Sequence, residues 1–471
     1  MITFILGIPT SIVIARILGP EGKGAYALIV LVPTLLALLG NLGIGIANVY
    51  FGGKRRYNWA ELASNSLVSA LAAGIVLAFA FLAYLFIANP AFLKGIEPGC
   101  LILATLTVPL SLLMVHFNSI LLGQNRMKEY NLVIVVQSGA LLMLVLLLLL
   151  ATKSGVLGTI VAWTSATLVA AVFSILLVRR TTNIKWSFHP RLFKDTVAFG
   201  VRGHLGNVMQ FLNYRLGMFL LASFASVTFV GYYSVSIALA EALWYFPGAV
   251  GIVLFARTPG MKAEEANRAT PRICRNTLFL TVLAALVVFG LGNYIITLLF
   301  GSAFLPALKP LWILLPGAAA LSISNVLCNE MAGRGKPIVG TIAAGASLAV
   351  NIPLNLLLIP RIGVSGAALA AGISYTLTTL VVLVAFLRIS KNSWVDTILL
   401  KREDLKIYTG AFSAVHSLNI RGEARRLITQ ALSLFSPGFW TGERTGDNPP
   451  VSDGRDSAEQ RRKETDSGGN H

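Results

Sequence analysis

The chain has 471 residues, of which 55% are hydrophobic and only 12% are charged, and its formal net charge is +18. With a mean hydropathy of +0.74, this composition excludes an ordinary soluble domain and indicates a protein built largely of membrane-spanning helices. The basic balance does not indicate nucleic-acid binding, because Lys and Arg beside such helices usually anchor cytoplasmic loops at anionic lipid.

Twelve apolar stretches follow one another along the chain, and most of them reach the ~20 residues that a helix needs to cross the hydrocarbon core. The predicted spans are residues 2–18, 25–49, 61–88, 98–121, 131–151, 157–178, 196–222, 228–256, 273–299, 306–328, 338–358 and 364–387. The sequence therefore predicts an all-α, polytopic membrane protein with about 12 transmembrane helices.

The two halves of this pattern are similar to each other. Residues 153–178 align with residues 361–386, and both segments open with Gly-Val-x-Gly, at Gly155 and at Gly363. Six spans in each half insert both halves the same way up. We therefore expect two parallel six-helix repeats that face each other across a cavity, as in many carriers.

This repeat sets the expected domain organisation. We expect an N-terminal six-helix lobe over residues 1–182, a C-terminal six-helix lobe over residues 183–395 and a polar cytoplasmic tail over residues 396–471. The tail is expected to be disordered because it is polar and lacks a hydrophobic pattern. Loops after even-numbered spans hold more than twice as many Lys and Arg as the opposite loops. The positive-inside rule then places both termini in the cytoplasm.

Ionisable side chains within the spans are the candidates for function, since they are costly at membrane depth unless they face a cavity or a partner. The span 196–222 contains His204, Asn207 and Arg215. At 100° per residue, His204 and Arg215 fall within about 20° of each other around the helix, and Asn207 shares their side. We expect these three residues to line a cavity.

Four further polar residues are weaker candidates for the same cavity. Glu241, in the span 228–256, is expected to pair with a cation of the preceding span or to carry a coupling proton. His116 and Asn118 form the polar centre at the far end of the span 98–121, and Arg16 lies at the end of the first span. No nucleotide-binding P-loop is present and the three cysteines lack metal-site spacing, so we expect no cofactor and no metal.

Several sequence segments carry a family resemblance. They are ARILGPEGKGAY at residues 15–26, LNYRL at residues 212–216, GYYSVSIALAEALW at residues 231–244, and the paired loops GQNR at residues 123–126 and GRGK at residues 333–336. With these segments in this order, the chain resembles the polysaccharide-biosynthesis, Wzx-type oligosaccharide flippases of the MOP exporter superfamily. The resemblance extends over roughly residues 1–407 and is specific for the family but not for a substrate.

The resemblance implies a MOP/MATE-like fold and a non-enzymatic function in cell-surface polysaccharide biosynthesis. It implies translocation of a polyprenyl-diphosphate-linked oligosaccharide across the plasma (inner) membrane by alternating access, with membrane lipid and glycan assembly proteins as further partners. In that function Arg215 would bind the diphosphate, because a guanidinium presents a fork to phosphate oxygens. Many members carry an acidic residue where this chain has Gly217, so a coupling role of that acid does not transfer.

Two other functions remain open at this stage. A multidrug or ion antiporter of the same superfamily would share the architecture but would favour acidic cavity residues. A membrane glycan polymerase or ligase would need a large extracytoplasmic loop, whereas the longest such loop here, Asn89–Pro98, has about ten residues. The cations within the spans favour transport of an anionic substrate over both alternatives.

Overall fold

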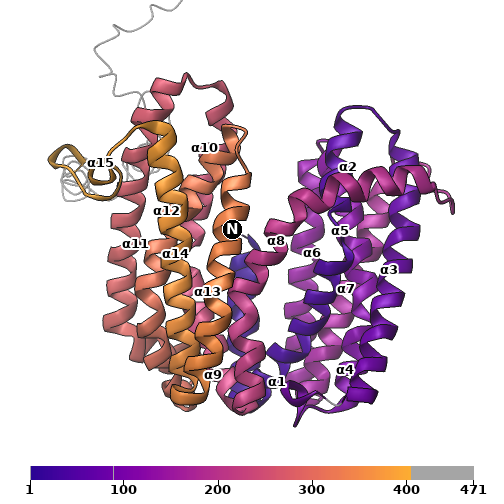
Figure 1. Cartoon of the computed structure of the whole chain (residues 1–471). Coiled ribbons are helices and arrows are strands. Elements are labelled where there is room, and N and C mark those ends of the chain that lie inside the picture. Colours follow the sequence, from indigo (N-terminus) through magenta and orange to yellow (C-terminus); the bar gives the residue numbers. More distant parts are fainter. Residues whose placement is uncertain (1, 89, 405–471) are drawn as a thin grey trace, which may run out of the picture. The chain divides into compact units, whose positions relative to one another are not determined.

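The computed structural model describes residues 2–88 and 90–404, and within these residues the fold is all-α and contains no strand (Figure 1). The predicted fold class is therefore confirmed. The tail that was predicted to be disordered lies, from Leu405 onward, outside the described residues.

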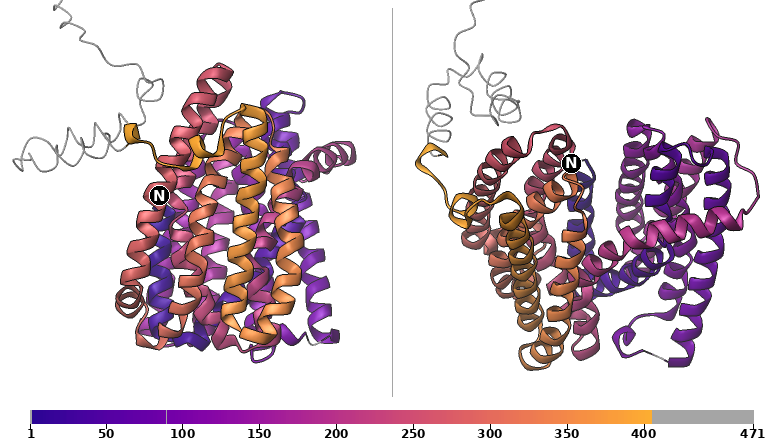
Figure 2. Two further views of the ribbon diagram at one scale, coloured as in Figure 1. Left: turned by 60° about the vertical axis from the view of Figure 1, so that its left-hand side comes forward. Right: turned by 45° about the horizontal axis from the view of Figure 1, so that its top comes forward.

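The helices of the first half are α1 (Ile2–Gly40), α2 (Ile44–Gly53), α3 (Trp59–Ala88), α4 (Pro98–Thr105), α5 (Thr107–Gly123), α6 (Met127–Leu146) and α7 (Gly155–Arg179). The helices of the second half are α8 (Pro190–Phe224), α9 (Val227–Ala242), α10 (Tyr245–Arg257), α11 (Ala263–Leu299), α12 (Leu308–Gly333), α13 (Ile338–Ile362), α14 (Val364–Ser390) and the short α15 (Trp394–Ile398). Figure 2 shows that the long helices of both halves run along a common direction.

The described helices account for the predicted spans once two special cases are considered. Nine helical segments are long and apolar enough to cross a membrane, and the bent pair α9–α10 makes a tenth. The polar helix α8 is not among them, although its 35 residues are long enough to cross. The helix α1 contains two predicted spans, because Gly19 inside it has a non-helical conformation with φ 66°. Dividing α1 there and adding α8 gives the twelve predicted segments.

The break in α1 follows from its local sequence. A positive φ is inexpensive for glycine, and the next residue, Pro20, suits the first position of a helix because it lacks a backbone N–H. The sequence Gly19-Pro20 therefore ends one helix and starts another without a long loop.

The internal repeat is visible in matching helix ends. After α5, Asn125 has φ 60°, and the N–H groups of Asn125 and Arg126 donate to the carbonyl oxygens of Leu122 and Leu121. After α12, Gly335 has φ 78°, and the N–H groups of Gly335 and Lys336 donate to the corresponding oxygens, those of Ala332 and Met331. Both ends are Schellman caps. The predicted glycine pair also matches, since Gly155 and Gly363 have φ values of 60° and 56°.

The largest buried cluster joins the two halves of the chain. It includes Ala25 and Leu28 of α1, Val230 and Ile237 of α9, and many apolar residues of α12 and α14. A separate buried cluster, around Phe117 of α5, fills the space among α1, α3, α5 and α7. The first half thus has its own core, and α1 also packs into the core of the second half.

Glycines bring the backbones of α1 and α9 together. A methyl group on Gly24 would stand 1.9 Å from the carbonyl oxygen of Val227, and one on Gly231 would stand 1.9 Å from that of Pro20. Nearby segments add an aromatic contact, since the rings of Phe92 and Phe219 lie 5.9 Å apart, edge to face. The halves are therefore held in direct contact at the end of the helices that contains Pro20.

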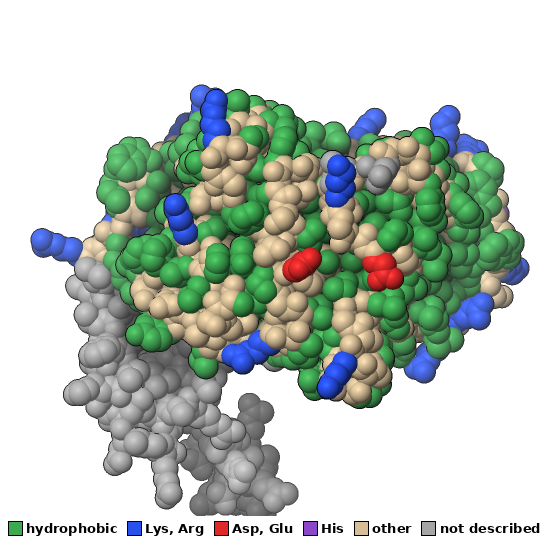
Figure 3. Space-filling model, turned by 90° about the horizontal axis from the view of Figure 1, so that it is seen from below, with side chains coloured by type: hydrophobic (Ala, Val, Ile, Leu, Met, Phe, Trp, Pro, Cys, Tyr) green, Lys and Arg blue, Asp and Glu red, His purple; other side chains and the backbone are tan. Residues whose placement is uncertain are grey.

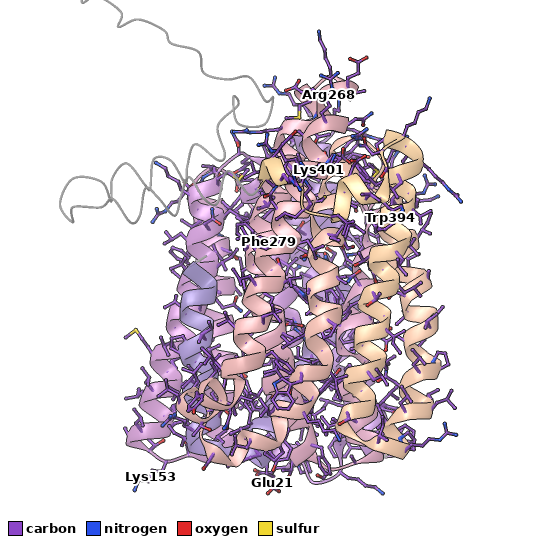
Figure 4. The ribbon with its side chains drawn as sticks, turned by 90° about the vertical axis from the view of Figure 1, so that its left-hand side faces the viewer. Glu21, Lys153, Arg268, Phe279, Trp394 and Lys401 are labelled. Atoms are coloured by element: carbon purple, nitrogen blue, oxygen red, sulfur yellow. The ribbon has the colours of Figure 1, made fainter. Side chains whose placement is uncertain are left out.

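Labelled residues mark the two ends of the helices. Glu21 and Lys153 lie at one end, and Trp394 and Lys401 lie at the other (Figure 4). Figure 3, which shows the molecule from below, displays a surface that is mostly hydrophobic or uncharged. Separate Lys and Arg side chains lie mainly around its rim, and acidic groups lie near its middle.

The first part of α8 packs against the first half of the chain. Asp195 accepts hydrogen bonds from the Arg56 guanidinium at 2.6 Å and from the Tyr57 hydroxyl at 2.7 Å. The bond to the Asp195 carboxylate raises the pKa of Tyr57 above its usual value. The aromatic ring of Phe199 stacks on Tyr50 of α2, with ring centres 4.3 Å apart. Later residues of α8 pack on α13 and α14, so α8 connects the two groups of helices.

A second unit of the chain includes, among the described residues, residues 262–269 and 402–404. Its described part includes the first turns of α11, with Glu264, Glu265 and Arg268.

Candidate functional site

The central feature of the candidate site is an ion pair between α8 and α9. The two guanidinium nitrogens of Arg215 donate to the two carboxylate oxygens of Glu241 at 2.7 and 3.1 Å. Both side chains are largely buried, with 27% and 23% of their surface exposed. Of the two alternatives predicted for Glu241, the structure has the pairing with a cation of the preceding helix. This bidentate arrangement balances the charge of Arg215.

Three aromatic rings pack beside this ion pair. Tyr214, which precedes Arg215, lies 5.0 Å from the ring of Trp244 and 5.6 Å from that of Tyr375, while Trp244 and Tyr375 are 5.3 Å apart. The indole N–H of Trp244 donates to the carbonyl oxygen of Ala318 at 3.1 Å, which fixes the ring. The ion pair therefore lies next to a packed aromatic cluster. Close packing of this kind lowers the local dielectric and so strengthens the attraction between the two charges.

Buried amides form a network on the opposite side of α8. The amide nitrogen of Asn351 donates to the side-chain oxygen of Asn213 at 2.7 Å, and the amide nitrogen of Asn213 donates to the hydroxyl of Ser347 at 3.1 Å. Asn355 donates to Asn351 one turn away on the same helix. A methyl group on Gly217 would stand 3.4 Å from the side-chain oxygen of Asn355, so the glycine that departs from the family pattern lies against this network.

A polar pocket opens beside the aromatic cluster, between α8, α12 and α13. Its volume is about 520 Å³. Asn207, Gln210 and Tyr214 line it from α8, and they lie on one face of this helix because they are three and four residues apart. Asn325 of α12 and Thr341 of α13 line it from the other sides. The lining therefore combines amides and hydroxyls with apolar groups such as Pro337 and Ile338.

The structure separates His204 from Arg215. The Nε2 of His204 lies 2.8 Å from the carbonyl oxygen of Leu38, at the end of α1, and the His204 side chain is buried. The two residues share a direction around α8, as predicted, but eleven residues separate them by about 16 Å along the helix axis. His204 therefore contacts α1 and does not form one site with the Arg215–Glu241 pair.

Arg16 lies at a different place from the one expected for a substrate ligand. Its guanidinium donates to the carbonyl oxygens of Leu298 and Leu299, at 2.9 Å for the latter. Carbonyls in the last turn of a helix lack partners within the helix and carry a partial negative charge. Arg16 thus caps the end of α11 in this structure.

His116 and Asn118 also lie away from α8. His116 lies beside a buried polar cluster of the first half, in which the amide of Asn48 donates to the hydroxyls of Ser66 and Ser119 at 2.9 and 3.1 Å. Asn118 is buried on the same helix, α5. The Nδ1 of His116 is 3.4 Å from the carbonyl oxygen of Ser66.

The predicted site residues thus occupy five places, of which the pocket and the ion pair are neighbours. Only Asn207, Arg215 and Glu241 lie in that neighbourhood. Sequence reasoning missed Asn325 and Thr341, and their only sequence signal was a polar residue within an apolar span. Within residues 2–88 and 90–404, no three His, Cys, Asp or Glu side chains gather closely enough to hold a metal ion.

Comparisons with known proteins agree with this architecture. The structure resembles that of the lipid II flippase MurJ in an inward closed conformation, with a TM-score of 0.71, 16% identity and coverage of 92% of this chain and 95% of that chain. It also resembles a multidrug resistance MATE family transporter of the MOP superfamily in an inward-facing conformation, with a TM-score of 0.65, 17% identity and coverage of 83% and 95%. These similarities establish the fold.

Sequence comparison establishes the family. An uncharacterized membrane protein, MJ1068, of Methanocaldococcus jannaschii is 23% identical over 248 residues, which cover 52% of this chain. The match spans 48% of that relative, so the chain matches about half of its length. The family model described as "Polysaccharide biosynthesis protein" matches residues 1–255, more than half of the chain. The chain therefore belongs to the polysaccharide biosynthesis protein family, and its fold is that of the MOP superfamily transporters.

Proposed function

We propose that the protein is a flippase that moves a lipid-diphosphate-linked oligosaccharide across the plasma membrane for cell-surface polysaccharide biosynthesis. The observation that carries this proposal is the polar pocket between α8, α12 and α13, with Arg202 among its lining residues. A sugar headgroup cannot cross hydrocarbon unaided, because each unsatisfied polar group there costs several kcal/mol. Amides and a cation within the helices offer the headgroup an alternative to water, while the lipid tail remains in the bilayer.

Alternating access is the mechanism that fits this proposal. The two lobes, residues 1–182 and 183–395, would rock against each other and expose the headgroup site first to one side of the membrane and then to the other. The direct contact of α1 with α9 through Gly24 and Gly231 would close one end of the path in the present arrangement. The diphosphate has two candidate ligands. One is Arg215, the residue predicted from the sequence, which would have to exchange Glu241 for phosphate oxygens. The other is Arg202, which lines the pocket.

The proposed orientation places both termini in the cytoplasm, and it yields a direct prediction. Cysteines introduced by Lys185→Cys and Lys94→Cys should lie on opposite sides of the membrane, with position 94 outside. In whole cells, a membrane-impermeant maleimide should label the variant at position 94 and should label the variant at position 185 only after lysis. Labelling of both in intact cells would contradict the twelve-span arrangement, and the unmodified chain controls for Cys100, Cys274 and Cys328.

Export of cationic drugs is the second candidate, since the MATE neighbours are multidrug transporters. Such a substrate would need acidic groups. Among the described residues that line the polar pocket, the one charged residue is Arg202, a cation. Glu241, the acid of the candidate site, is already paired with Arg215.

One cell experiment separates the two functions. Cells depleted of the protein should accumulate lipid-linked oligosaccharide that impermeant periodate cannot oxidise, because the sugar stays on the cytoplasmic side. Efflux of ethidium should be unchanged. Normal oxidation of the glycolipid together with slower ethidium efflux would favour the antiporter.

A further inference from the structure

In the described part of the chain, the pocket between α8, α12 and α13 contains polar side chains without partners, and these indicate which part of the substrate it binds. Among the described residues, the side-chain amides of Asn207 and Asn325 and the hydroxyl of Thr341 have no hydrogen-bond partner within the protein. Asn207 is exposed, and Asn325 and Thr341 are half-buried. Their donors and acceptors are therefore open to a ligand.

These groups suit an uncharged, hydroxyl-rich ligand. An amide offers two N–H donors and a carbonyl acceptor, and a threonine hydroxyl both donates and accepts, so each can match a sugar hydroxyl in either role. Tyr214 adds an aromatic side chain to the wall of the pocket, and such a ring combines an apolar face with a polar end. At about 520 Å³, the pocket lies in the size range of small-molecule sites.

One charged group stands among these neutral ones. Arg202 lines the pocket five residues before Asn207 and is exposed. Its guanidinium can bind two oxygens of a phosphate at once, as the planar fork of arginine does. A neutral polar surface beside a single cation matches a sugar that is joined to a phosphate.

The packing of α8 against α13 keeps the pocket lining accessible. Gly206 lies on α8 between Arg202 and Gln210, and a methyl group there would stand 2.6 Å from the hydroxyl of Thr341. Gly203 also lines the pocket and adds no side chain. Gly206 thus lets α8 approach α13 while the amides remain accessible.

We propose that this pocket binds the uncharged sugar next to the diphosphate of the lipid-linked substrate, and that Arg202 holds the diphosphate itself. The inference rests on the proposed function and adds the part of the substrate that the second half of the chain recognises. Asn207, Asn325 and Thr341 are the sugar ligands, and Tyr214 provides a ring on which the sugar lies. The pocket thereby selects for the first sugar and not only for charge.

The test uses the full chain in lipid nanodiscs and four short-chain polyprenyl diphosphates. One probe has no sugar, and the other three carry glucose, galactose or N-acetylglucosamine on the diphosphate. The wild type should bind at least one sugar-bearing probe about ten- to a hundredfold more tightly than the bare diphosphate, as expected for two or three added hydrogen bonds. The double variant Asn207→Ala/Asn325→Ala should lose this preference while its Kd for the bare diphosphate stays within about twofold.

Further variants separate the two parts of the site. Arg202→Gln should weaken all four probes by about tenfold, since it removes one charge-assisted contact and leaves the sugar preference in place. Asn207→Trp should fill the pocket and abolish the preference in the same way as the double alanine variant. Asn131→Ala is the matched control, because this amide bonds within its own helix, α6, and should change no Kd.

The outcomes distinguish this inference from the proposed function. If the wild type binds the bare diphosphate but none of the sugar-bearing probes more tightly, the sugar pocket is wrong and the flippase proposal stands. The same holds if the double variant keeps the full preference. If the wild type binds no probe at all, the proposed function fails and the inference fails with it.

Discussion

Replacing Gly24 by alanine will destabilise the contact of α1 with α9 and slow transport by at least about tenfold. The added methyl group would stand 1.9 Å from the carbonyl oxygen of Val227 and 2.8 Å from the backbone nitrogen of Gly231, so the two helices must move apart. Forcing atoms into such a packed contact costs about 1–3 kcal/mol. A change of 1.4 kcal/mol alters an equilibrium tenfold, so the closed arrangement of this end will become a minor state.

The control for this prediction is Gly290→Ala in α11. A methyl group there meets no atom within 4 Å, and replacing a helical glycine by alanine normally stabilises the helix. Thermal unfolding in detergent and transport in vesicles should therefore be impaired for Gly24→Ala and Gly231→Ala but not for Gly290→Ala. Equal behaviour of all three variants would show that the helices tolerate the added volume and that this contact does not control transport.

Breaking the Arg215–Glu241 pair on one side only will destabilise the protein strongly. Removing one partner of a fully buried pair costs about 3–5 kcal/mol, because the remaining charge is left uncompensated. Here about a quarter of each side chain is exposed, so we expect about 2–3 kcal/mol for Arg215→Met or Glu241→Leu. The double variant Arg215→Met/Glu241→Leu should recover most of this stability, since no unpaired charge remains.

Transport by the double variant tells whether the pair has a function beyond stability. If Arg215 binds the diphosphate, the stable double variant should transport at less than about a tenth of the wild-type rate. Arg215→Lys should give an intermediate rate, because it keeps the charge and loses the fork. Full transport by the double variant would show that the pair only holds α8 against α9, and Arg202 would then be the remaining cation of the described pocket.

The fold was predictable because it depends on local sequence. Apolar length is sufficient to find most spans, and the repeated Gly-Val-x-Gly segments have similar positive φ angles at Gly155 and Gly363. Hydropathy alone fails for α8, because this helix contains several polar and charged residues. The first two spans were also separable in the sequence, since Arg16, Glu21 and Lys23 lie near their junction, and the structure has its break at Gly19.

The site was predictable only in part, because side-chain partners depend on how helices pack. His204 and Arg215 were found as polar residues of one span, but their distance along the axis gives them different partners, Leu38 and Glu241. Nothing in the sequence places Asn325 opposite Asn207, since their helices meet through tertiary packing.

The partner of Arg16 was unpredictable for the same reason, because it also depends on how the helices pack. The carbonyl groups at the end of α11 are available to any donor that packs against them, and the sequence does not indicate which helix this is. Positions of cations within spans can therefore be read from sequence, whereas their partners cannot.

The central claim is that the chain moves the headgroup of a lipid-linked oligosaccharide across a bilayer. The most direct measurement reconstitutes the purified full chain into sealed vesicles that contain a fluorescent polyprenyl-diphosphate disaccharide, and follows its oxidation by impermeant periodate. We predict that the glycolipid protected in protein-free vesicles becomes oxidised within minutes when the wild-type chain is present, and much more slowly with Gly24→Ala. Oxidation that is no faster than in protein-free vesicles, by a chain that remains folded, would contradict the proposed function.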